Sequence, residues 1–106
     1  MLEVHLANSL DAAAVSEPEF EIDFDLHSAF FKHARPSEGC PIIQRMRDYY
    51  SDCCISESEL PNLIVEIDKI ANKVPPNSPY QKMLSNFRRA CLAGTQSGSS
   101  LFLVCD

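Results

Sequence analysis

The sequence contains no tryptophan and only three glycines, and no apolar run approaches the roughly 20 residues that would span a bilayer. The first residues lack the basic and apolar regions of a secretory signal. A Gly-rich phosphate loop, a Gly-x-Ser-x-Gly elbow and a His-Glu-x-x-His motif are also missing. We therefore expect a cytoplasmic protein that is not an enzyme and has no membrane partner. With 106 residues, of which 45% are hydrophobic, it should fold as a single domain over residues 1–106.

The cysteines are odd in number and include no Cys-x-x-Cys pair, which is unlike a secreted disulfide scaffold. They are Cys40, Cys53, Cys54, Cys91 and Cys105. We expect five reduced thiols in a reducing compartment. Four residues could supply zinc ligands: His27, His33, Cys40 and Cys53. Their spacing matches no common zinc finger, and no local signature marks a nucleophilic cysteine, so no metal or cofactor is expected.

Alternation of apolar and polar residues predicts two strands, at 1–7 and 19–26, and an apolar run predicts a third at 100–105. Helical spacing predicts four helices, at 28–35, 41–51, 58–74 and 79–93. The terminal apolar strand needs partners, and the two N-terminal strands can supply them. The expected fold is therefore α+β, with a sheet of about three strands packed on three to four helices.

Several residues mark where these helices should begin and end. Ser56 and Glu59 have the spacing of a capping box, and Ser78 precedes a proline and a glutamine suited to a helix start. Pro41 is well placed as a first helical residue. Gly94 is the expected C-terminal stop of the last helix.

The charge is distributed unevenly along the chain. Residues 1–31 hold seven acids and no Lys or Arg, whereas residues 32–106 hold eight acids and nine bases, for a total of −6. On the predicted strand 19–26, four carboxylates would face outward in one row, with Glu17 at its rim. The four are Glu19, Glu21, Asp23 and Asp25.

Three interpretations of this acidic row remain open. In the first, it simply keeps the sheet edge soluble and unpaired, as charge runs usually do. It could instead form a docking surface for a basic protein, or imitate the phosphates of a nucleic acid in a nuclease cleft. Metal binding by Asp23 and Asp25 is the third interpretation, although no glycine-containing calcium loop surrounds them.

The C-terminal half contains Ser58-Glu-Leu-Pro-Asn-Leu-Ile-Val-Glu-Ile-Asp-Lys-Ile, a second amphipathic helix from Met83 to Ala93, and a short strand ending in Asp106. This half of the chain resembles small bacterial immunity proteins, the antidotes encoded beside polymorphic or contact-dependent toxins. The resemblance implies a non-catalytic, tight-binding cytoplasmic inhibitor. Such inhibitors are often acidic because many of the toxins are basic nucleases.

We accordingly predict an immunity protein that binds and inhibits a basic toxin, with a nuclease as the expected class. The acidic residues would supply charge complementarity, and Tyr49 or Tyr50 would supply the aromatic anchor that tight binding needs. A regulatory adaptor for another protein is the first alternative. A nucleic-acid-binding module is the second, although the net negative charge argues against it. It would use arginines on two helices: Arg45, Arg47, Arg88 and Arg89.

Overall fold

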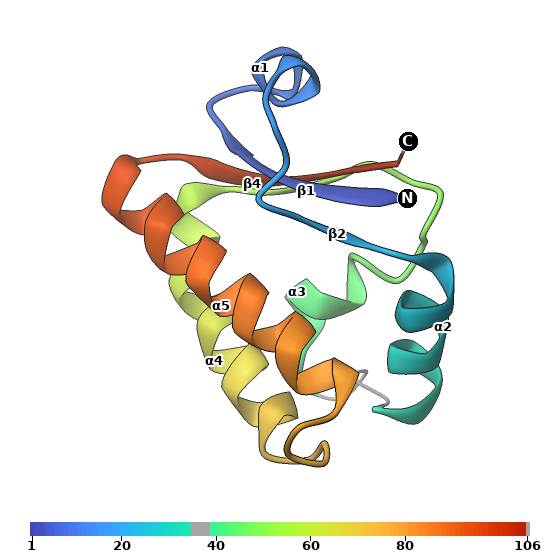
Figure 1. The fold of residues 1–106 in the computed structure, drawn as a ribbon. Helices are drawn as coiled ribbons and strands as arrows, with labels where there is room; N and C mark the ends of the chain where they lie inside the picture. The colour runs from blue at the N-terminus through green and yellow to red at the C-terminus, as the bar shows by residue number, and fades with distance from the viewer. Residues whose placement is uncertain (35–38, 106) are drawn as a thin grey trace.

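The computed structural model describes residues 1–34 and 39–105, which form an α+β fold. Its antiparallel sheet has four strands in the order β2-β1-β4-β3. The strands are β1 (Leu2–Ala7), β2 (Phe20–Ile22), β3 (Cys53–Ile55) and β4 (Ser100–Cys105). The described helices are α1 (Leu10–Val15), α2 (Phe24–His33), α3 (Pro41–Gln44), α4 (Leu60–Ala71) and α5 (Pro79–Ser97). Helices α2 to α5 lie on one side of the sheet, as expected, and α1 lies on the other (Figure 1).

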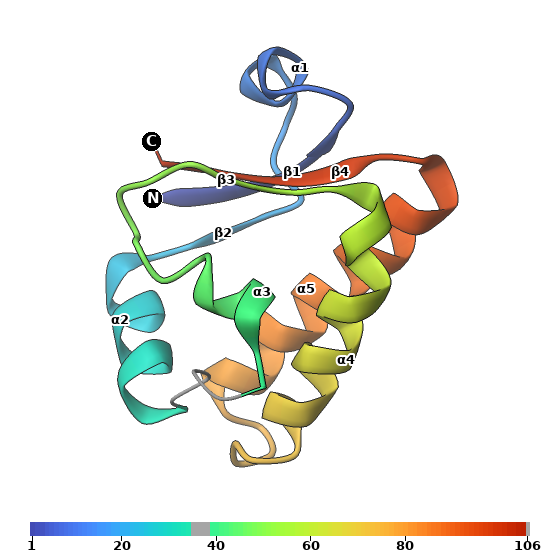
Figure 2. The same cartoon turned by 180° about the vertical axis from the view of Figure 1, so that it is seen from behind.

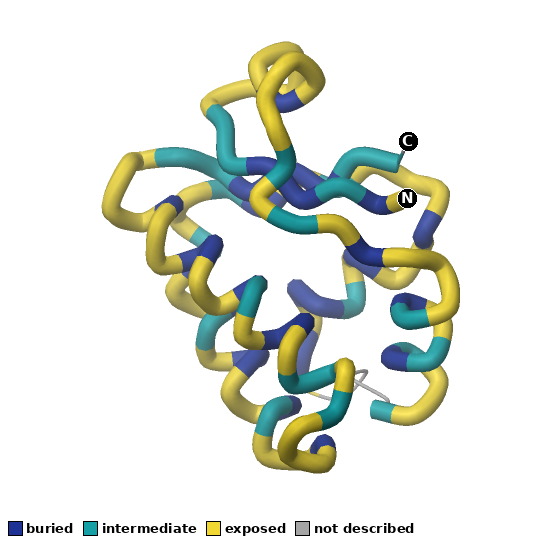
Figure 3. Tube along the Cα trace, in the orientation of Figure 1, coloured by how far each residue is buried: buried dark blue, intermediate teal, exposed yellow. Residues whose placement is uncertain are grey.

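Strands β1 and β4 confirm the predicted terminal strands and form the centre of the sheet. They pair in register from Leu2 opposite Cys105 to Ala7 opposite Ser100. Alternate residues of both strands point toward the helices and are buried, including Val4 and Leu103. In Figure 3 the buried positions line the space between this sheet and the helices below it. The hydrophobic core therefore lies between the two layers.

The predicted strand 19–26 is too long, because β2 ends at Ile22. Asp23 becomes the N-cap of α2, and its carboxylate accepts a hydrogen bond from the Leu26 N–H at 2.7 Å. Asp25 adds a second negative charge in the first turn, where the helix dipole favours it. The helix predicted at 28–35 consequently begins at Phe24 and runs to His33, while residue 35 lies outside the described part of the chain.

The predicted helix 41–51 is also too long, because α3 spans only Pro41–Gln44. Beyond it, the backbone continues in turns whose hydrogen bonds reach back three residues, as from Met46 to Ile43. The Asp48 carboxylate then accepts hydrogen bonds from the Tyr50 N–H at 3.0 Å and the Ser51 hydroxyl at 2.8 Å. A side chain that bonds its own following backbone in this way competes with continuation of a helix.

The ends of α4 and α5 follow the predicted caps in part. The capping box of Ser56 and Glu59 forms, but it opens a three-ten turn at Glu57–Glu59, and α4 covers Leu60–Ala71 of the predicted 58–74. Helix α5 starts on the Ser78 cap, as predicted. Gly94 does not end it, because α5 continues to Ser97 and Gly98 is the left-handed C-cap.

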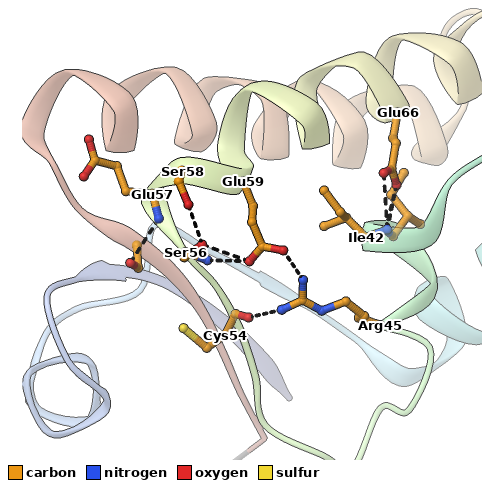
Figure 4. A network of polar contacts seen from close by, with 10 residues as sticks. Ile42, Arg45, Cys54, Ser56, Glu57, Ser58, Glu59 and Glu66 are labelled. Carbon is orange, nitrogen blue, oxygen red and sulfur yellow. Dashed lines mark hydrogen bonds and ion pairs between the residues drawn. The ribbon is translucent and has the colours of Figure 1, made fainter.

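The side chains of Glu66 on α4 and of Arg45, the residue that follows α3, connect the segment between α2 and β3 to the rest of the molecule (Figure 4). The buried Glu66 carboxylate accepts hydrogen bonds from the Ile42 and Ile43 N–H groups, at 3.0 and 2.9 Å. The Arg45 guanidinium donates to the Glu59 carboxylate and to the Cys54 carbonyl. The hydrogen bond from Arg45 to the Cys54 carbonyl secures β3. Sequence periodicity did not predict this edge strand, which lies beside β4 in Figure 2.

Candidate functional site

The five acids singled out in the sequence are all exposed, but they do not form one row. Glu19 and Glu21 lie just before and within β2, where Glu21 is opposite Glu3. Asp23 and Asp25 instead lie at the start of α2. The prediction of four carboxylates on one strand face is therefore wrong, because the chain changes from strand to helix at Asp23. Glu17 precedes both groups and is also exposed.

None of these five acids takes part in an ion pair within the described residues. The ion pairs found there join Arg45 to Glu59, Arg88 to Asp68 and, when the imidazole is charged, His5 to Glu3. These five acids thus keep negative charges that no neighbouring cation of the described residues compensates. This charge is available to an outside partner.

The two tyrosines predicted as anchors have different surroundings. Tyr49 is buried, and its hydroxyl donates a hydrogen bond to the Ile22 carbonyl at 3.1 Å. Tyr50 is 72% exposed and lies beside Phe24, which is 48% exposed, with ring centroids 6.1 Å apart. Both rings also contact Tyr49, at 5.5 and 5.3 Å. Tyr49 is therefore a support for an exposed aromatic pair made of Phe24 and Tyr50.

Sequence reasoning missed Phe24, because alternation with Phe20 and Ile22 assigned its side chain to the inner face of a strand. The signal that could have found it is Asp23, a favoured N-cap residue, followed by an acid in the first turn. That pattern indicates a helix start at Phe24. A helix start there frees the phenylalanine from the strand face.

A surface groove of about 470 Å³ runs between α2 and the segment that follows α3. We call it the α2 groove. One wall comes from α2 and consists of Phe24, His27, Ser28, Phe31 and Lys32. The other wall consists of Arg47, Asp48, Tyr49 and Tyr50. Aromatic rings and charged side chains therefore line the same groove, and the exposed aromatic pair is part of it.

His27 lies in the wall of this groove, and its Nε2 is 2.7 Å from the Met46 carbonyl oxygen. Burial lowers the pKa of His27 below its ordinary value of 6.5, against the opposing effects of the Met46 carbonyl and the Asp48 carboxylate. The imidazole is thus neutral at pH 7 and donates from Nε2. Its hydrogen bond connects the two walls, which gives His27 a structural role.

A second histidine lies between a serine and a carboxylate, an arrangement that invites comparison with hydrolases. His5 Nδ1 is 2.9 Å from Ser16 Oγ, and Nε2 is 2.9 Å from the Glu3 carboxylate. The Ser16 hydroxyl also lies 3.0 Å from the Ala13 carbonyl oxygen in the last turn of α1, and His5 itself is buried. The three side chains therefore join β1 to the C-terminal end of α1. We interpret this network as the connection that holds α1 on the outer face of the sheet.

The other interpretations of the sequence gain no geometric support. The described residues contain no group of three or more His, Cys, Asp or Glu side chains placed to hold a metal ion. All five thiols are unpaired. Of the four arginines considered for nucleic-acid binding, Arg45 and Arg88 are each bonded to a carboxylate, which leaves only part of the set for phosphates.

No helix among the described residues is long and apolar enough to cross a bilayer. Comparison of the chain with protein families, with curated proteins and with solved structures finds no match.

Proposed function

We propose that this chain is a cytoplasmic immunity protein that binds and inhibits a basic toxin, with a nuclease as the expected class. One observation carries the proposal. Two exposed aromatic rings, Phe24 and Tyr50, lie together beside Asp23 and Asp25, two exposed acids without ion-pair partners in the described chain. The unpaired thiols fit the reducing compartment that the proposal assumes.

The two kinds of residue would act at different stages of binding. Uncompensated acids attract and orient a basic partner before contact, so they govern the rate of association. Aromatic side chains that become buried at an interface supply much of the binding energy, so they govern dissociation. Tyr49 fixes the positions of both exposed rings, because it contacts them and bonds to the Ile22 carbonyl. A rigid anchor loses little conformational freedom on binding.

The aromatic anchor can be tested with the basic protein encoded by the neighbouring open reading frame. We expect Tyr50→Ala and Phe24→Ala each to raise the Kd at least about tenfold, the effect of losing an anchor contact. Leu92→Ala is the matched control, because Leu92 is an apolar side chain that is 44% exposed on α5. Surface plasmon resonance gives the Kd, and inhibition of the partner's nuclease activity separates an inhibitor from a regulatory adaptor. Unchanged affinity in both aromatic variants would overturn the proposal.

The acidic surface needs a test that spares the fold. Asp23→Lys would remove the cap of α2 and cost about 1 kcal/mol of stability, so Asp23→Asn is used instead. Combined with Asp25→Lys, it should slow association at low salt. Stopped-flow mixing over a salt series measures this, and the difference should shrink as salt screens the charges. Glu57→Lys, which changes an exposed acid outside the α2 groove, is the control. Equal association rates for all three proteins would contradict the role of Asp23 and Asp25.

A further inference from the structure

The charged side chains near the α2 groove differ from one end of α2 to the other. Tyr50 lies beside Phe24 at the start of α2, and the Met46 carbonyl bonds to His27 one turn later. The wall formed by residues 46–50 therefore runs alongside α2, with Tyr50 nearest the N-terminus of the helix and Arg47 further along it. Of the two cations that line the groove, Arg47 follows Met46 in this wall, and Lys32 lies further along α2 than His27.

The charged side chains of α2 itself also change from acidic to basic along the helix. Asp25, Ser28 and Lys32 are spaced three and four residues apart, so they share one face of the helix. At 1.5 Å per residue, Asp25 and Lys32 are separated by about 10 Å along the axis. Asp23 and Asp25 flank Phe24 at the start of α2, just outside the lining of the groove, whereas Lys32 and Arg47 line it further from that start.

The two cations that line the groove are available for binding. Lys32 and Arg47 are exposed, and neither side chain forms an ion pair within the part of the chain that the structure describes. Asp48 is the acid closest to Arg47 in sequence, and its carboxylate, which accepts hydrogen bonds from Tyr50 N–H and Ser51 Oγ, also lines the groove. The lining thus carries two positive charges and one negative charge, whereas the whole chain has a net charge of −6.

We propose that the α2 groove binds an extended segment of the partner that carries one basic and one acidic side chain about three residues apart. The basic side chain would lie beside Asp25, and the acidic one would pair with Lys32 and Arg47. An apolar side chain between them would pack on Phe24 and Tyr50. Three residues of extended chain span about 10 Å, which matches the separation of Asp25 and Lys32 along the helix axis. This inference rests on the proposed function and specifies which segment of a basic partner the groove selects.

Pairing with an acidic side chain and attraction by net charge alone predict opposite effects on affinity when the two cations are replaced by acids. If only net charge mattered, replacing Lys32 and Arg47 with acids would strengthen binding to a basic partner. If an acidic side chain of the partner pairs with these cations, the same change places like charges together and weakens binding. The double variant Lys32→Glu/Arg47→Glu therefore separates the two models. Both residues are exposed and unpaired, so folding should be preserved, and circular dichroism checks this.

The experiment selects a displayed library of random heptapeptides on the wild-type protein, on the double variant and on Phe24→Ala/Tyr50→Ala. We expect the wild type to enrich peptides with a basic and an acidic residue three positions apart. A synthetic peptide of the enriched sequence should bind the double variant about tenfold or more weakly, as expected for replacing an ion pair with repulsion. Lys82→Glu, which changes an exposed cation on α5, is the matched control and should bind normally.

Two results would overturn the inference. One is enrichment of peptides that require Phe24 and Tyr50 but show no acidic preference, or bind the double variant unchanged. In that case Phe24 and Tyr50 still act as the aromatic anchor of the proposed function, but the pairing of an acidic side chain with Lys32 and Arg47 is refuted. The other is that no selected peptide depends on Phe24 and Tyr50, which removes the groove as a docking site. Binding of the intact basic protein then tests the proposed function separately.

Discussion

At the scale of single residues, His27 links the α2 groove to the stability of the fold. Its imidazole is buried, donates to the Met46 carbonyl and has a pKa lowered by that burial. In the unfolded chain the same group titrates near its ordinary value of about 6.5. As the pH falls below this value, the unfolded state takes up the proton before the folded state does, and unfolding becomes more favourable.

The contribution of His27 is therefore fully present above about pH 6.5 and is lost as the pH falls toward the lower pKa of the folded state. We expect the free energy of unfolding to decrease with a slope of up to about 1.4 kcal/mol per pH unit from this group. Urea unfolding across this range measures the slope. His27→Gln should flatten it, whereas His33→Gln, at an exposed position, should not. Identical slopes in all three proteins would refute this role.

At the scale of elements, the sequence predicts that Gly94 ends α5, whereas in the structure its lack of a side chain allows that helix to pack closely. A Cβ at this position would lie 2.8 Å from Leu60 Cδ1, 3.1 Å from Leu6 Cδ2 and 3.1 Å from the Ser99 carbonyl oxygen. The missing side chain thus lets α5 approach both the start of α4 and the sheet. The glycine that ends α5 is Gly98, whose φ of 72° suits a residue without a Cβ.

We expect Gly94→Ala to lower the free energy of unfolding by about 1 kcal/mol. Overpacking costs about 1–3 kcal/mol, and the gain in helix propensity returns about 1 kcal/mol of this. Urea denaturation measures the change. Gln96→Ala, on the exposed side of the same helix, is the control and should be nearly neutral. A stabilised Gly94→Ala protein would show that the neighbouring side chains move aside at little cost.

Elements were predictable from the sequence where periodicity and capping residues agreed. Strand β4 and the start of α5 at Ser78 follow the prediction, because a continuous apolar run defined the first and a cap defined the second locally. Strand β3 was missed because three residues are too few to show a period, and its pairing with β4 depends on distant residues. At Asp23, alternation and a helix start overlapped in the sequence, and the helix start prevailed.

The candidate site was predictable only residue by residue. The sequence indicated the exposed acids, since charge runs are solvated, and a pair of adjacent tyrosines, of which Tyr50 is the exposed one. It could not indicate the α2 groove, because its walls come from segments that meet only through tertiary contacts, such as His27 with Met46. The order of the charged side chains along the groove depends on the same contacts.

At the scale of the whole molecule, the fold depends on a strand that joins distant parts of the chain. Strand β4 lies between β1 and β3 and buries Leu101 and Leu103 in the core. Deletion of residues 100–106 removes both of those side chains and the hydrogen-bond partners of two strands. Each fully buried leucine contributes about 1.5–3 kcal/mol, and a domain has about 5–15 kcal/mol in total.

We therefore expect the chain without residues 100–106 to be unfolded, with the loss of its far-ultraviolet circular dichroism and of its cooperative thermal transition. Val104→Thr is the control, because Val104 is partly exposed on the outer face of the same strand. It should retain the fold. A truncated chain that still unfolds cooperatively would mean that the helices and remaining strands form a stable unit on their own.

The position of β4 also sets the order of events during translation. Of the described elements, this strand leaves the ribosome last, yet β1, which is made first, must wait for it before its second edge is covered. Until then the nascent chain exposes an open strand edge and the apolar sides of its helices, the surfaces that invite aggregation. Insertion of β4 between β1 and β3, rather than the folding of any earlier segment, is thus the step that closes the sheet.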